Sequence, residues 1–187
     1  MHIDATFQVT GLNAMLSIDP PFRFPRRLYF LETYWKAVVK PNLMLVGPKH
    51  DVTGQIQKCR SCSFDQAKEE AKLLLRQAGH RVGFSVAPYP RIALAGKHYR
   101  EPYPHFRKTL ILWCLRVNGA EKFYSNLEKL GITLTHAIPY LTVYTHEDSR
   151  SHDGVELYTP LEVMRHTQEL IPQALPPLLL ESRPDLG

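Results

Sequence analysis

Two histidine–threonine pairs have the residue types and the spacing for acid–base chemistry. His2 is followed four residues later by Thr6, and His105 is followed by Thr109 at the same spacing. In an extended strand, residues four apart lie on the same face of a sheet. An imidazole titrates near neutral pH, so two histidines brought together across a sheet could act as general base and acid on a phosphodiester. The predicted catalytic residues are therefore His2, His105, Thr6 and Thr109.

This pattern is similar to the paired motifs of the two-histidine phosphoesterases. Those proteins use His-x-Thr or His-x-Ser, whereas the spacing in this chain is His-x-x-x-Thr. A later strand also has Tyr140 where such a motif would place a histidine. The resemblance implies phosphodiester chemistry as a hypothesis, and the sequence by itself does not place the chain in that family.

A mixture of tyrosines and basic residues occupies positions 89–108. Tyrosine rings can stack on bases while arginine and lysine meet phosphates, which is how many proteins hold single-stranded nucleic acid. Tyrosine and arginine also favour protein interfaces, so a protein partner or a homo-oligomer is the alternative. The predicted ligand-binding residues are Tyr89, Arg91, Lys97, His98, Tyr99, Arg100, Tyr103, Arg107 and Lys108.

Two further clusters could hold a metal or act through thiols. Positions 145–154 read THEDSRSHDG, and the predicted metal ligands are His146, Asp148, His152 and Asp153. Cys59 and Cys62 form a C-x-x-C directly before a predicted helix, whose N-terminus would lower a thiol pKa. One C-x-x-C without a second pair is a weak zinc signal. The chain has no glycine-rich phosphate loop and no G-x-S-x-G elbow, so the cofactor is unknown.

Composition and charge limit the class of protein. The chain has 187 residues, of which 44% are hydrophobic and 22% charged, as in ordinary globular domains. Three cysteines and the lack of a signal-peptide pattern or a long apolar run favour a cytoplasmic protein without a membrane span. Positions 1–129 hold 20 Lys and Arg against 10 Asp and Glu, whereas positions 130–187 hold 3 against 8. The basic first part could attract phosphates.

The hydrophobic patterns predict the elements that would position these residues. Alternation predicts strands at 2–10, 42–46, 81–87, 106–117 and 138–145. Spacings of three and four residues, with capping signals, predict helices at 26–39, 63–79, 118–131 and 159–170. Four prolines predict a loop over 88–105, in which 92–95 could form a short strand, and residues 49–61 are predicted as a polar connection.

These elements predict one α+β domain over 1–170 and a proline-rich tail over 171–187. We expect a mixed or antiparallel sheet with helices mainly on one face, and the two histidine pairs suggest a degenerate ferredoxin-like duplication. The predicted function is binding of nucleic acid or a phosphorylated ligand, with histidine-dependent phosphodiester chemistry as an extension. The alternatives are a non-enzymatic protein interaction module and a metal- or thiol-dependent enzyme.

Overall fold

A computed structural model of the chain describes residues 3–18, 25–30, 32–38, 41–98, 106–146 and 157–170. The described helices are α1 (Val52–Arg60), α2 (Phe64–Gly79), α3 (Ala120–Lys129) and α4 (Pro160–His166). The described strands are β1 (Ile3–Thr10), β2 (Asn13–Ile18), β3 (Arg27–Phe30), β4 (Thr33–Ala37), β5 (Asn42–Val46), β6 (Phe84–His98), β7 (Phe106–Asn118), β8 (Tyr140–His146) and β9 (Thr167–Leu170). The protein is therefore of the α+β class.

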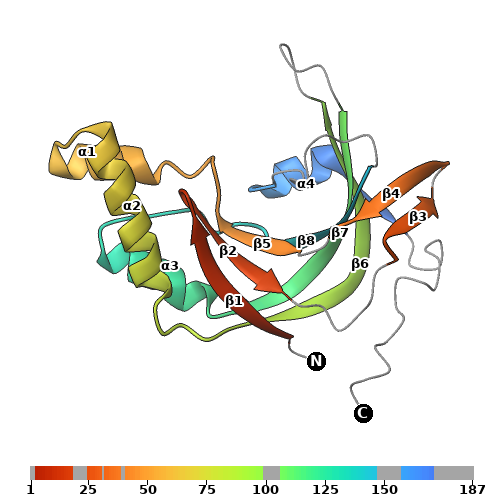
Figure 1. Cartoon of the computed structure of the whole chain (residues 1–187), viewed down its shortest axis with the longest axis horizontal. Coiled ribbons are helices and arrows are strands. Elements are labelled where there is room, and N and C mark those ends of the chain that lie inside the picture. Colours follow the sequence, from red (N-terminus) through yellow and green to blue (C-terminus); the bar gives the residue numbers. More distant parts are fainter. Residues whose placement is uncertain are drawn as a thin grey trace.

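The strands pair in the order β3-β4-β8-β7-β6-β1-β2-β5, and β9 pairs with β6 off this path. Each described pair is antiparallel. The register of β6 shifts between Ala87 and Pro88 and again before Ile92. Before the shift β6 pairs with β1, and after it β6 pairs with β9. The run β5-β2-β1-β6-β7 is curled, and the helices α1, α2 and α3 gather at the end opposite the β3–β4 hairpin (Figure 1).

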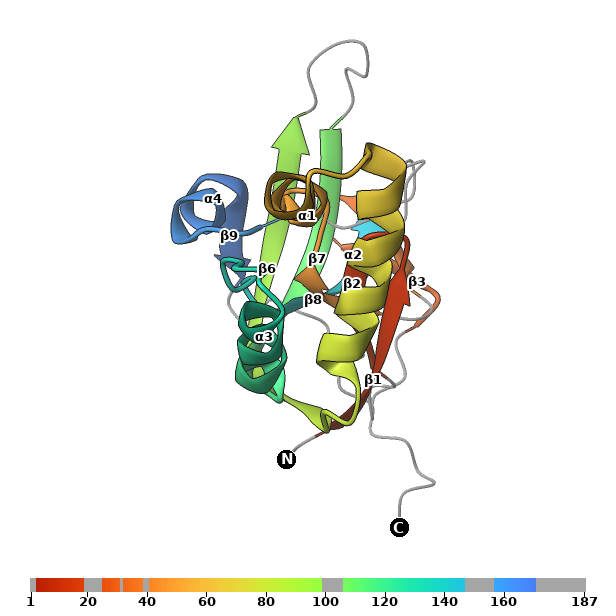
Figure 2. The ribbon, with the colours of Figure 1, turned by 90° about the vertical axis from the view of Figure 1, so that its left-hand side faces the viewer.

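The antiparallel pairing confirms one part of the predicted architecture and corrects another. A ferredoxin-like half contains a βαβ unit, and the strands of such a unit run parallel. In this protein β7 and β8, the strands on either side of α3, instead pair antiparallel with each other, so the expected ferredoxin-like duplication is wrong. Three helices lie together while α4 lies apart from them beside β9, as Figure 2 also shows.

The core lies between the curled sheet and the three grouped helices. The described core residues of β2, Ala14, Leu16 and Ile18, alternate with more exposed positions, as one buried face of a strand requires. A cluster of rings joins the sheet to the helices: Phe7 stacks on Phe84 with centroids 5.3 Å apart and lies 5.4 Å from Phe123. This cluster fixes α3 against β1 and β6.

The predicted helix after Ser63 is confirmed in detail. The Ser63 hydroxyl accepts from the backbone N–H of Gln66, and the Gln66 side chain accepts from the backbone N–H of Ser63. This reciprocal capping box satisfies two donors that a helix start leaves open. The buried face of α2 consists of Ala67, Ala71, Leu74, Leu75, Ala78 and Gly79.

The predicted helix at 26–39 is wrong, because the described part of this segment is the β3–β4 hairpin. The register pairs Leu28 with Trp35, and both side chains are buried. Two residues seven positions apart lie on one side of a helix, but they also become partners when a chain reverses midway between them. Aromatic and β-branched residues, including Tyr29, Thr33 and Tyr34, favour the strand.

Two predicted connections are regular elements. The polar stretch at 49–61 contains α1, where the Asp51 side chain accepts from the Gly54 N–H and Val52, Thr53 and Ile56 are buried. Within the predicted loop at 88–105, residues 88–98 belong to β6, and residues 99–105 lie outside the described part of the chain. Pro88 lies at a register shift, where a strand tolerates a residue that cannot donate a hydrogen bond.

Candidate functional site

A cavity of about 400 Å³ lies where β5, the end of β7 and the start of α3 meet. Its wall combines aliphatic, aromatic and charged side chains. The described lining residues are Leu43, Leu45, Arg116, Val117, Asn118, Gly119, Ala120, Glu121, Tyr124, His136, Ala137 and Pro139. The size suits a small ligand, and binding pockets commonly pair an apolar wall with a few polar groups.

A glycine turn leaves the start of α3 without a side-chain cap. Gly119 is the N-cap residue and has φ +86°, a conformation that glycine adopts most readily. A Cβ at this position would lie 2.5 Å from the carbonyl oxygen of Gly83, so packing also requires glycine. The sequence pattern places the N-cap at Asn118, whereas the N-cap residue is Gly119 and the Asn118 side chain donates to the Ser85 hydroxyl at 2.8 Å. The first turn of α3 therefore offers amides that attract an anion.

Tyr124 and His136 form the aromatic part of the cavity. Their rings stack with centroids 4.0 Å apart and planes 12° apart. The Tyr124 hydroxyl donates to the Leu45 carbonyl at 2.6 Å and accepts from the Ala137 N–H at 3.1 Å. Burial raises the pKa of Tyr124. Tyr124 is therefore a fixed neutral wall, on which the exposed imidazole of His136 rests.

The charged side chains of the cavity are Arg116, from the end of β7, and Glu121, from the first turn of α3. Both are exposed. Arginine can bind a phosphate through two parallel N–H groups, and the amides at the start of α3 would add to this. The Glu121 carboxylate has the opposite effect on an anion, since like charges repel. The cavity is thus suited to an anionic group placed nearer to Arg116 than to Glu121.

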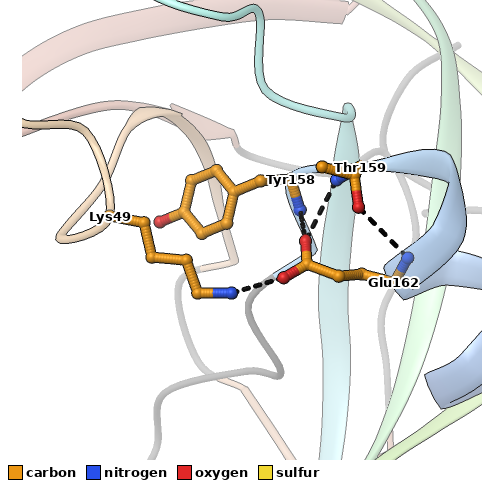
Figure 3. A network of polar contacts seen from close by, with 4 residues as sticks. All are labelled: Lys49, Tyr158, Thr159 and Glu162. Carbon is orange, nitrogen blue, oxygen red and sulfur yellow. Dashed lines mark hydrogen bonds and ion pairs between the residues drawn. The ribbon is translucent and has the colours of Figure 1, made fainter.

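A second polar group ties α4 to the turn after β5, as Figure 3 shows. The Lys49 ammonium lies 2.5 Å from one Glu162 carboxylate oxygen, and the other oxygen accepts from the N–H groups of Tyr158 and Thr159. The Thr159 hydroxyl accepts from the Glu162 N–H at 3.2 Å. The predicted capping box of this helix is thereby confirmed, although α4 ends at His166 and β9 follows.

The geometry around His50 assigns the proton on its ring. Nδ1 accepts from the Gly47 N–H at 3.0 Å, so it carries no proton. Nε2 lies 2.9 Å from the Thr135 carbonyl and must donate to it. The ring also packs edge-on against Tyr158, with centroids 5.0 Å apart. His50 is therefore a neutral structural link between the turn after β5 and the segment that follows α3.

The ion pair of Glu162 makes stability depend on pH. The Lys49 partner, followed by the backbone N–H groups, lowers the pKa of Glu162 from 4.5 to about 2. The stabilisation is therefore complete above about pH 4.5 and is lost as the pH falls through about 2. The pair is partly exposed, so solvent screening limits its value to about 1 kcal/mol.

We expect Glu162→Gln, which can still cap α4, to lower the free energy of unfolding by about 1 kcal/mol at pH 7. The difference from the unsubstituted protein should shrink toward pH 2 in urea titrations at several pH values. Glu128→Gln, at an exposed position of α3, serves as the control. A difference that stays constant from pH 7 to pH 2 would contradict this assignment.

The register separates the two predicted catalytic threonines. Thr6 follows Ala5, whose partner in β6 is Phe84, whereas Thr109 pairs with Ala95 near the other end of β6. Thr6 is exposed, and Thr109 is 1% exposed with no hydrogen-bond partner for its hydroxyl among the described residues. The structure therefore does not bring Thr6 and Thr109 into one site. His2 and His105 lie outside the described residues, so their pairing stays a prediction.

The predicted ligand-binding segment is described in its backbone only. The β6–β7 register pairs Lys97 with Arg107 and Gly96 with Lys108, so basic residues oppose each other near the end of this hairpin. Tyr89, Arg91 and His98 belong to β6. Tyr99, Arg100 and Tyr103 lie outside the described residues. The expected surface at 89–108 stays a prediction.

The predicted metal cluster and thiol pair are placed only in part. His146 ends β8, where its Nε2 lies 2.7 Å from the Thr33 hydroxyl and its ring meets Trp35 edge-on. Asp148, His152 and Asp153 lie outside the described residues, and no group of three metal-ligating side chains occurs among those described. Cys59 is exposed within α1, and Cys62, which lies between α1 and α2, is half-buried.

Sequence reasoning did not predict the cavity. Arg116, His136 and Leu43 belong to three separate segments, and no local spacing relates them. The one available signal is the Asn118-Gly119 turn after a strand, which starts a helix at the point where an anion could bind. Compared with known proteins, the chain matches no family model, no curated protein and no solved structure. No described helix is long and apolar enough to cross a membrane.

Proposed function

We propose that the protein binds a small phosphorylated ligand in the cavity at the start of α3. The observation that carries the proposal is that Arg116 and the uncapped first turn of α3 line the same cavity. In such a complex the phosphate lies against the Arg116 guanidinium and the first amides of α3.

The remainder of the ligand contacts the other walls. Leu43 and Leu45 supply aliphatic surface, and the His136 ring, supported from one side by Tyr124, supplies an aromatic surface. A nucleotide has both an anionic group and a flat ring, so it matches this combination. Among the described lining residues, His136 is the one histidine. Acid–base catalysis by a histidine pair would need a second histidine, so the proposal concerns ligand binding and not catalysis.

The proposal predicts a loss of phosphate affinity when Arg116 is replaced. The probe is adenosine 5′-monophosphate, with adenosine as its uncharged counterpart, in isothermal titration calorimetry. We expect Arg116→Ala to weaken monophosphate binding roughly 10- to 150-fold, because a hydrogen bond to a charged group contributes about 1.5–3 kcal/mol. Adenosine should bind weakly to both proteins. Glu121→Gln should strengthen monophosphate binding, because it removes a repelling charge.

The control is Lys58→Ala, which removes one positive charge from the exposed last turn of α1. This variant should bind the monophosphate as the unsubstituted protein does. Equal losses in Arg116→Ala and Lys58→Ala would mean that net charge and not the cavity governs binding, and the proposal would then be abandoned.

A further inference from the structure

The outer face of the β3–β4 hairpin gathers two tyrosines and two basic residues. The register pairs Tyr29 with Tyr34 and Arg27 with Lys36. All four residues are exposed, and they alternate with the buried pair of Leu28 and Trp35. Tyr29 is 61% exposed and Tyr34 is 54% exposed. We call these four residues the hairpin face; they lie at the opposite end of the molecule from α2 and α3 (Figure 1).

Strand propensity and the contact between the two rings explain only part of the composition of the hairpin face. Large aromatic side chains contribute most to stability when they are buried, yet both tyrosines expose more than half of their surface. Their rings contact each other with centroids 4.9 Å apart and planes 59° apart, which leaves much of each ring open. Arg27 and Lys36 place two positive charges on the same face, opposite each other on the two strands. A ligand with negative charge and flat rings would match both the open rings and these charges.

We infer that the hairpin face binds single-stranded nucleic acid, at a site separate from the cavity proposed above. Bases stack on Tyr29 and Tyr34, and phosphates contact Arg27 and Lys36. The tyrosine pair and the basic pair are two residues apart along each strand, about 6.5–7 Å, a distance that one nucleotide spans. The hairpin face itself contains no carboxylate, so its charge favours a polyanion.

The occupant is a nucleic acid and not an acidic protein segment because of the aromatic pair. The carboxylates of an acidic protein segment would bind to Arg27 and Lys36, but they would make few favourable contacts with the exposed tyrosine rings. Single strands present a base beside each phosphate, and every base has a π-face, so such binding tolerates many sequences. Backbone contacts make the affinity fall as salt rises.

The experiment measures fluorescence anisotropy of labelled U12 and dT12 oligonucleotides with the full chain at low and moderate salt. We expect Tyr29→Ala combined with Tyr34→Ala to weaken binding roughly 10-fold or more, given the usual value of base stacking. Tyr29→Phe combined with Tyr34→Phe keeps the rings and should bind within about twofold of the unsubstituted protein. Arg27→Ala combined with Lys36→Ala should weaken binding and reduce its dependence on salt. The U12 and dT12 arms, which differ in the sugar and in the thymine methyl group, show whether the hairpin face prefers RNA or DNA.

Two controls separate this inference from the proposed function. Arg116→Ala should leave oligonucleotide binding unchanged, and the tyrosine substitutions should leave monophosphate binding unchanged. Thermal melts check that the exposed substitutions keep the fold. The inference is overturned if the unsubstituted protein does not bind either oligonucleotide at low salt, or if the double alanine variant at the tyrosines binds as before. Equally tight binding of a poly-glutamate peptide, lost in the same variants, would overturn it in favour of an acidic protein partner.

Discussion

Replacement of Phe123 by alanine is expected to lower the free energy of unfolding by about 3–5 kcal/mol, as for other large core residues. The side chain is fully buried at 0% exposure. Its ring contacts those of Phe7, Phe84 and Tyr124, with centroid distances of 5.4, 6.4 and 5.4 Å. The substitution therefore leaves a cavity at the point where α3 meets β1 and β6. Urea denaturation followed by circular dichroism measures the change.

Two variants show whether the ring cluster is responsible. Phe123→Leu keeps most of the volume and loses the aromatic contacts, so we expect a smaller loss of about 1–2 kcal/mol. Phe64→Ala, at a position that is 57% exposed, should stay within about 0.5 kcal/mol of the unsubstituted protein. A loss below 1 kcal/mol for Phe123→Ala would show that the helices are not held to the sheet by this cluster.

Trp35→Ala is expected to have an effect of similar size, about 3–5 kcal/mol, at the other end of the molecule. Trp35 is 1% exposed, and its indole N–H donates to the Phe30 carbonyl at 2.8 Å. The ring also meets His146 edge-on, so it joins the β3–β4 hairpin to β8. Its loss removes both the packing and the hydrogen bond that hold the hairpin in place. Equilibrium unfolding in urea provides the measurement.

The matched variant is Trp35→Phe, which keeps an aromatic ring and loses the indole donor. We expect it to cost about 1–3 kcal/mol, since the Phe30 carbonyl loses its partner in a half-buried setting. If the hairpin depends on Trp35, oligonucleotide binding should fall in Trp35→Ala while monophosphate binding in the cavity persists. An unchanged midpoint of unfolding in Trp35→Ala would contradict the role assigned to this residue.

The sequence predicted an element correctly where its capping residues or its hydrophobic pattern fit only one type of secondary structure. Ser63 and Gln66 define a helix start by chemistry that needs no tertiary contact, and Thr159 and Glu162 do the same. The alternation from Ile3 to Thr10 likewise gave β1. At 27–37 the spacing of Leu28 and Trp35 fits a helix as well as a hairpin. Residues 31 and 32 are Leu and Glu, so the glycine or asparagine that usually marks a tight hairpin is missing.

The predictions also failed where tertiary contacts outweigh local composition. α1 is polar along most of its length, and it is held by three buried positions, Val52, Thr53 and Ile56. The prolines of β6 suggested a loop, but the register shift at Pro88 lets the strand continue. The cavity brings together residues from β5, β7 and α3, and its existence depends on the strand order. Strand order is a long-range property that spacing along one segment does not encode.

The pairing of Trp35 with His146 joins two strands that are far apart along the chain. β6 and β7 follow each other along the chain, so their hairpin closes a short loop at low entropic cost. The elements between β4 and its neighbour β8 along the chain are β5, α1, α2, β6, β7 and α3. Attachment of the β3–β4 hairpin therefore closes the longest of these loops, and non-local pairings of this kind slow folding. We therefore expect the end of the molecule with the exposed tyrosines to join the rest last.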